Sequence, residues 1–96
     1  MTKAKLEFHV KKEYASGEMV EMKVWQLPVT SLERPHRLKY SFFYGRVGQR
    51  VVGYDNELGK GDHRHIFDRE EKYIFISVEK LVADFLESIE EIGGLK

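Results

Sequence analysis

The residues most able to do chemistry lie together in the segment Gly59–His65, which reads GKGDHRH. Gly59 and Gly61 flank Lys60, and glycine lets a backbone take positive φ angles and approach a ligand closely. Such a turn can present several N–H groups to an anion, with the Lys60 ammonium as a positive charge beside them. The segment therefore predicts a loop that faces a phosphate group.

Two histidines follow the glycines at a spacing of two residues. In an extended backbone His63 and His65 lie on one side, whereas Asp62 and Arg64 lie on the other. Imidazoles titrate near neutral pH, so this pair can act as a general base and a general acid, while Lys60 and Arg64 stabilise charge on a phosphate. We therefore predict His63, His65 and Asp62 as catalytic residues. The predicted reaction is metal-independent phosphodiester cleavage, in which a ribose 2′-hydroxyl attacks its own phosphate, and no cofactor is expected.

The same H-x-H spacing also suits two ligands of Zn²⁺ or of another nitrogen-preferring ion. In this alternative His63 and His65 hold a metal, and Asp55, Asp62 or His36 completes the site. No third ligand lies nearby in the sequence at a spacing typical of a metal site, so acid–base chemistry is the leading hypothesis. A third interpretation is that the two histidines only bond to carbonyl groups of the loop.

Alternating apolar residues predict the strands that must position this segment. Residues 6–14 and 20–25 alternate around a glycine-bearing turn, and residues 38–44 show the clearest alternation in the chain. The long polar stretch that follows is typical of a functional loop. The expected segments are two β-hairpins in residues 1–55, a functional loop in residues 56–71 and a short strand in residues 72–76.

Apolar residues at helical spacing predict a C-terminal helix over residues 77–92. Ser77 is a good N-cap, and Gly93 and Gly94 are typical of a helix end. The sequence therefore predicts one α+β domain over residues 1–96. Its antiparallel sheet has about five strands, and the single C-terminal helix packs on one face.

Composition limits the class of protein. The chain has 96 residues, of which 42% are hydrophobic and 33% charged, as in globular domains, and it has no cysteine. No apolar run approaches the ~20 residues of a membrane span, and the N-terminus lacks the apolar core of a signal peptide. We therefore expect a cytoplasmic protein without a membrane partner.

Charge and aromatic residues suggest surfaces for partners. Residues 34–69 carry eight basic and four acidic side chains, a net +4, whereas residues 70–96 carry seven acidic and three basic ones, a net −4. A basic middle beside an acidic end favours two kinds of partner. Trp25, Tyr40, Phe42 and Tyr44 could stack on bases, although aromatic alternation on a strand is more typical of a core.

Residues 52–92 contain five short motifs: YDN at 54–56, GKGDHRH at 59–65, DREE at 68–71, YIF at 73–75 and VEKLVADFLESI at 78–89. Through these motifs the segment resembles the TumE family of small proteins, described as the toxin halves of bacterial and archaeal toxin–antitoxin pairs. It implies an antitoxin that contains a helix-turn-helix, and it places Asp55 and Asn56 in the same motif as the loop. The predicted phosphate- or substrate-binding residues are therefore Lys60, Arg64, Gly59, Gly61, Asp55 and Asn56.

These observations lead to one functional hypothesis and one alternative. We expect a toxin-like component of a toxin–antitoxin module that cuts RNA, with Asp62 or Asp55 orienting a histidine. The expected partners are RNA and the antitoxin, with homodimerisation when the antitoxin is absent. The alternative is a non-catalytic module that binds nucleic acid or protein and regulates a neighbour.

Overall fold

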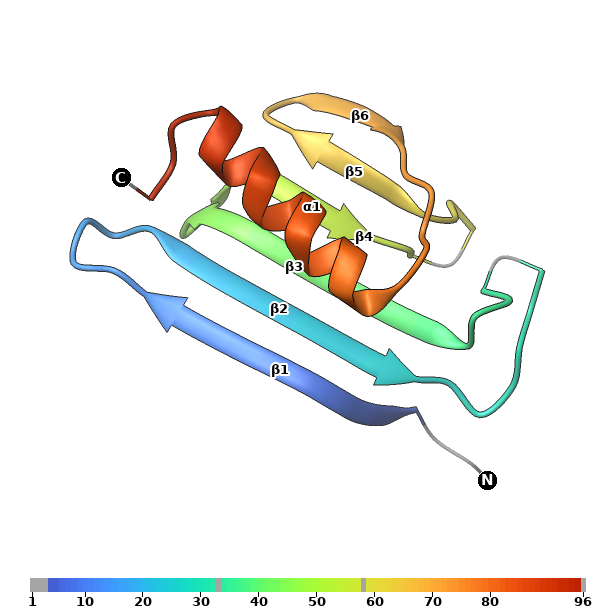
Figure 1. Cartoon of the computed structure of the whole chain (residues 1–96). Coiled ribbons are helices and arrows are strands. Elements are labelled where there is room, and N and C mark those ends of the chain that lie inside the picture. Colours follow the sequence, from blue (N-terminus) through green and yellow to red (C-terminus); the bar gives the residue numbers. More distant parts are fainter. Residues whose placement is uncertain (1–3, 33, 58, 96) are drawn as a thin grey trace.

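Six antiparallel strands form one sheet whose spatial order is the order of the chain. The computed structural model describes residues 4–32, 34–57 and 59–95. Each strand pairs with the next, so the sheet is a meander from β1 at one edge to β6 at the other (Figure 1). The strands are β1 (Lys5–Glu13), β2 (Met19–Gln26), β3 (Leu38–Arg46), β4 (Gln49–Asp55), β5 (His63–Ile66) and β6 (Arg69–Lys72).

One helix, α1 (Val78–Glu91), crosses one face of this sheet (Figure 1). Ser77 caps it, because its side-chain oxygen accepts a hydrogen bond from the Lys80 N–H at 3.0 Å. Gly93, at φ 76°, follows its end. The predicted α+β architecture is confirmed, with six strands in place of about five. No helix in the described residues is long and apolar enough to cross a membrane.

The core lies between α1 and the middle strands. Alternate residues of β2, β3 and β4 point to the helix side, and apolar side chains of α1 pack against them. In the described part of the chain no helix covers the opposite face, which we call the open face. The buried apolar residues are Val20, Met22, Val24, Tyr40, Phe42, Tyr44, Val52, Tyr54, Leu81, Phe85 and Ile89.

Phe85 should contribute more to stability than its exposed neighbour in α1. Its ring is fully buried and meets Phe42 and Tyr54 edge to face, at centroid distances of 5.3 and 6.1 Å. We expect Phe85→Ala to lower the free energy of unfolding by about 3–5 kcal/mol, because the deletion leaves a cavity. Leu86→Ala, at a half-exposed position, should cost under about 1 kcal/mol. Urea unfolding measures both, and equal losses would contradict this packing.

The prediction that residues 56–71 form a loop is wrong, because β5 and most of β6 lie within that range. The two strands form a hairpin that closes at Phe67, whose φ is 55°. Their residues, HRHI and REEK, lack the apolar alternation that marks a half-buried strand. Pairing of β5 with β4 rests instead on backbone hydrogen bonds, which residue type does not reveal.

The strand expected over residues 72–76 is also wrong, since Lys72 ends β6 and the next residues pair with no strand among those described. The apolar run at 73–76 has another cause. Phe75 stacks on Tyr40 at 5.6 Å and Tyr73 packs against Tyr54 at 4.9 Å, while Ile74 is exposed. This segment carries the chain from the sheet edge over the core to α1.

Candidate functional site

The two histidines of β5 lie side by side on the open face of the sheet. Pairing of β4 with β5 sets Asp55 opposite His63 and Gly53 opposite His65. The histidine ring centroids are 5.0 Å apart, and the residues are only 4% and 8% exposed. Because Arg64 between them points to the other face, the alternation of an extended strand brings the two imidazoles together.

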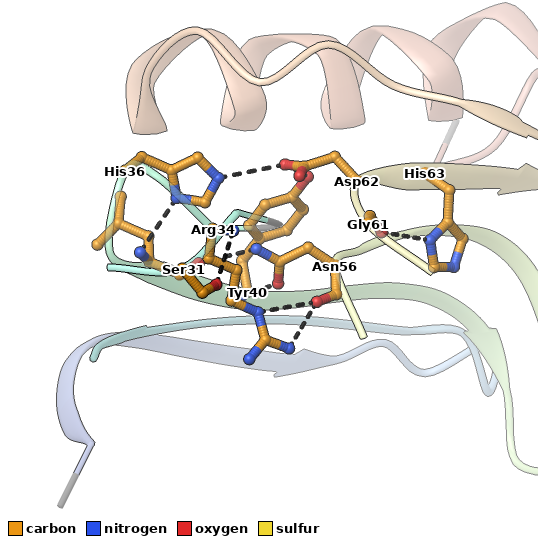
Figure 2. A network of polar contacts seen from close by, with 9 residues as sticks. Ser31, Arg34, His36, Tyr40, Asn56, Gly61, Asp62 and His63 are labelled. Carbon is orange, nitrogen blue, oxygen red and sulfur yellow. Dashed lines mark hydrogen bonds and ion pairs between the residues drawn. The ribbon is translucent and has the colours of Figure 1, made fainter. Parts of the chain in front are cut away.

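Asp55, at the end of β4, completes a cluster with these histidines. Its Oδ1 lies 2.5 Å from the Nε2 of His63. On the other side of the ring, His63 Nδ1 donates to the carbonyl oxygen of Gly61 at 2.9 Å (Figure 2). One ligand atom from each of Asp55, His63 and His65 lies within 4.8 Å of the others. We call these three residues the Asp55–His63–His65 cluster.

The surroundings of His65 favour its neutral form. Burial lowers the pKa of His65, and the nearby charge of Arg50 lowers it further. Arg50 reaches this position because Gly53 has no side chain: a Cβ there would lie 2.7 Å from Arg50 Cδ. Glu70 lies 3.6 Å from His65 Nε2 and acts in the opposite direction. A neutral imidazole can accept a proton or bind a metal ion.

Asp62 does not lie in this cluster. It belongs to the helix side, where its Oδ2 accepts a hydrogen bond from the Tyr40 hydroxyl at 2.7 Å and lies 3.4 Å from His36 Nε2 (Figure 2). Burial and the contact with Asp62 raise the pKa of Tyr40. The structure thus places the predicted catalytic Asp62 and the alternative ligand His36 away from the two histidines. Asp55 occupies the position beside them.

Arg64 also lies apart from the histidines, on the helix side. Its guanidinium pairs with Glu71 and donates to the Tyr54 hydroxyl at 3.2 Å. The hydrogen bond to Tyr54, followed by the one to Glu71, raises the pKa of Arg64. The predicted joint action of Arg64 with His63 and His65 is therefore not supported by their placement.

The glycine-flanked turn has the predicted backbone. Gly59 and Gly61 have φ angles of 91° and 72°, in the left-handed region that favours glycine. Lys60 is exposed, and its backbone N–H donates to the Glu57 backbone carbonyl at 3.1 Å. Gly61 has a direct part in the cluster, because its carbonyl holds the His63 ring.

Asn56 and Arg34 form a buried polar connection beside the cluster. The Asn56 side chain bonds to the backbone of β3, and the backbone carbonyl oxygen of Asn56 accepts from Arg34 Nε and Nη2 at 3.1 and 2.7 Å (Figure 2). Arg34 is 8% exposed. Sequence reasoning missed Arg34, since it lies between Pro28 and Pro35 in a segment without periodicity.

A pocket of about 540 Å³ opens beside Asp55. It combines cationic and aromatic side chains, and Lys39 Nζ lies 5.2 Å from the centre of the Trp25 ring. Tyr40, Phe42 and Tyr44 belong to the core, as their alternation indicated. Trp25 instead reaches this pocket. The lining residues are Trp25, Arg34, Lys39, Tyr40, Ser41, Asp55 and Glu57.

Comparison with known proteins supports the resemblance found in the sequence. Residues 2–92 match the family described as Toxin TumE. Comparisons with curated proteins and with solved structures gave no match. The match extends over the hairpin of β1 and β2 as well as the motif around β5. The chain therefore belongs to the TumE family, and it is the toxin component of a toxin–antitoxin module.

Proposed function

We propose that this toxin acts on RNA and cuts a phosphodiester bond at the Asp55–His63–His65 cluster. The observation that carries the proposal is the position of the cluster. Its two buried histidines and one carboxylate lie at the edge of a pocket that is lined by charged and aromatic side chains. Proton-transferring groups beside a charged pocket are the usual elements of a hydrolytic or phosphoryl-transfer site.

The pocket offers what a short piece of RNA requires. Arg34 and Lys39 provide positive charge for phosphate groups, and the Trp25 ring provides a surface on which a base can stack. The volume of about 540 Å³ lies within the usual range for small-ligand sites. Asp55 lines this pocket, so a phosphate held there would lie next to the cluster.

The proposed reaction uses the ribose 2′-hydroxyl as nucleophile. Its oxygen forms a bond to the adjacent phosphorus, and the bond between phosphorus and the 5′-oxygen breaks. A base takes the proton of the 2′-hydroxyl, and an acid gives a proton to the leaving 5′-oxygen. The products are a 2′,3′-cyclic phosphate and a free 5′-hydroxyl. In the metal-independent form predicted from the sequence, His63 and His65 are the base and the acid.

Purified full-length chain should therefore cut single-stranded RNA and leave DNA of the same base sequence intact. DNA lacks the 2′-hydroxyl, so this mechanism has no nucleophile in it. Mass spectrometry of the fragments should find 2′,3′-cyclic phosphate ends. Equal cutting of DNA would exclude attack by the 2′-hydroxyl. A folded chain that cuts neither substrate, yet binds RNA, would favour the non-catalytic module.

The toxin family implies an antitoxin partner, and we propose that the antitoxin is a helix-turn-helix protein that pairs with the edge of β1. Almost every residue of β1 is exposed, and no described strand pairs with its outer edge. A free strand edge is a template for another chain. β6, at the opposite edge, offers only four residues, REEK.

Hydrogen exchange should locate the antitoxin. In the co-expressed complex we expect slower exchange of β1 amides and little change in β6, because only the edge of β1 would gain backbone partners. The chain alone, at high concentration, should show the same protection if it pairs with a second copy. Two proteins that never co-elute in size-exclusion chromatography would contradict the partnership, and protection confined to β6 would contradict the edge.

A further inference from the structure

We infer that Asp55, His63 and His65 bind one divalent transition-metal ion, and that Zn²⁺ is the ion that fits these ligands best. The role of the ion in RNA cleavage rests on the proposed function. Binding of the ion can be tested without RNA. The inference also replaces the metal-independent chemistry that the sequence favoured. Three features of the Asp55–His63–His65 cluster carry it: the orientation of His63, the surroundings of Asp55 and the set of ligand atoms.

The orientation of His63 leaves one ring nitrogen available to a metal. The Gly61 carbonyl oxygen lies 2.9 Å from Nδ1, and since a carbonyl only accepts, Nδ1 carries a proton. In the neutral ring Nε2 then has a free lone pair directed into the cluster. A hydrogen bond from the second nitrogen to a backbone carbonyl is the usual way proteins orient a metal-binding imidazole.

The buried Oδ1 of Asp55 has surroundings in which a bound cation would stabilise it. This oxygen lies 2.5 Å from His63 Nε2, yet the described residues offer it no partner with hydrogen-bond geometry. A proton shared by the two groups would require the ring N–H to point at the oxygen. Two ligands of one ion instead point at a common third position, so a shared cation explains the poor alignment of the two groups.

The distances set how far the ligands must move. Tetrahedral ligands at about 2.0–2.2 Å from zinc lie roughly 3.3 Å from one another. Asp55 and His63 would therefore separate by somewhat under ~1 Å from their present 2.5 Å. The widest separation, within 4.8 Å, would shorten by about 1–1.5 Å on the same geometry. Side-chain rotations at the end of β4 and along β5 can supply both changes.

The ligand set indicates the kind of ion and the kind of site. Two imidazole nitrogens and one carboxylate favour zinc or a neighbouring transition metal over Mg²⁺ and Ca²⁺, which prefer oxygen ligands. Three protein ligands are typical of catalytic zinc, because the fourth position stays open for water or substrate. Asp55 also lines the pocket with Arg34 and Lys39. An ion held by Asp55 would thus face the proposed position of the phosphate.

Ion binding can be measured directly on the full-length chain. Protein stripped with a chelator should bind one Zn²⁺ per chain in calorimetry, and Co²⁺ should give the visible absorption of a tetrahedral site. His63→Ala and His65→Ala should each weaken binding by more than about 100-fold, since loss of a ligand should exceed the 10–100-fold effect of outer-sphere changes. His9→Ala is the matched control, because His9 lies on the same face but pairs with Glu21 at 2.9 Å. It should bind Zn²⁺ like the wild type.

The outcomes separate this inference from the proposed function. Zinc binding that is absent, or that survives both histidine substitutions in folded protein, overturns the metal site. A folded chain that binds no Zn²⁺ and still cuts RNA overturns the metal site and leaves the proposed function standing. One tightly bound ion without any RNA cleavage supports the metal site and contradicts the proposed function. Cleavage lost with the ion and restored by adding Zn²⁺ supports both.

Discussion

Replacing His63 or His65 with alanine is expected to reduce RNA cleavage by about 10²- to 10⁴-fold, the usual effect of losing a proton-transferring group. A similar loss is expected if the two residues hold an ion. Asp55→Asn keeps the shape of the side chain but removes its charge, so it should reduce cleavage as well. Quantified cleavage of a labelled RNA measures these effects, with growth inhibition on induction as the cellular counterpart.

The double variant tests whether the histidines act as one unit. If they do, His63→Ala with His65→Ala should cost little more than either change alone, because effects within a catalytic unit are not additive. Both residues are buried, so circular dichroism and urea unfolding must show that each variant folds. His63→Gln provides a second variant that retains a polar group of similar length.

Matched controls come from histidines outside the cluster. His9→Ala changes the same face of the sheet at an exposed position and should cleave like the wild type. His36→Ala removes a ring that packs against Phe75 with the ring centroids 4.3 Å apart, so it should lower stability more than cleavage. Full growth inhibition by the double variant, at equal expression and stability, would contradict every catalytic mechanism and leave a binding mechanism.

The fold was predictable where burial imposes a period on the sequence. Residues of β3 alternate because one face packs on the helix, and α1 repeats its apolar residues because one side packs on the sheet. β5 and β6 were not predictable in this way. Their strand pairing depends on backbone atoms. The buried residues of β5 on the open face are the two histidines, which give no apolar alternation.

The site was predictable only as far as it depends on local geometry. An extended backbone places His63 and His65 on one side and Arg64 on the other, and the structure has this arrangement. The choice between Asp55 and Asp62 depends on the register of β4 with β5, which sets Asp55 opposite His63. Sequence spacing contains no information about that register, so the sequence left both carboxylates open.

The pocket could not be predicted because its residues come from distant segments. Arg34 reaches it from the connection between β2 and β3, and its guanidinium is held by the Asn56 carbonyl 22 positions away. Trp25 and Lys39 face each other because β2 and β3 pair in that register. A single sequence gives no signal for such pairings.

Asn56→Ala should strongly destabilise the chain, because this side chain continues the pairing of β3 beyond the end of β4. Its Oδ1 accepts from the Tyr40 N–H at 2.9 Å, and its Nδ2 donates to the Leu38 carbonyl at 2.8 Å. Asn56 is only 1% exposed, so water cannot easily replace these partners. Leaving the buried Tyr40 N–H unpaired should cost about 1–3 kcal/mol, and the half-buried Leu38 carbonyl adds to that cost.

Aspartate should not rescue this position, since a carboxylate cannot donate to the Leu38 carbonyl. Ser31→Ala is a suitable control, because Ser31 is exposed and the change removes one part-buried hydrogen bond to the Arg34 backbone N–H. It should cost about 0.5 kcal/mol or less. Urea unfolding of the three variants measures the difference. An Asn56→Ala chain with unchanged stability but impaired RNA cleavage would show instead that Asn56 contacts substrate, as its place in the motif suggested. A large loss of stability would assign Asn56 to the frame that holds Arg34 at the pocket.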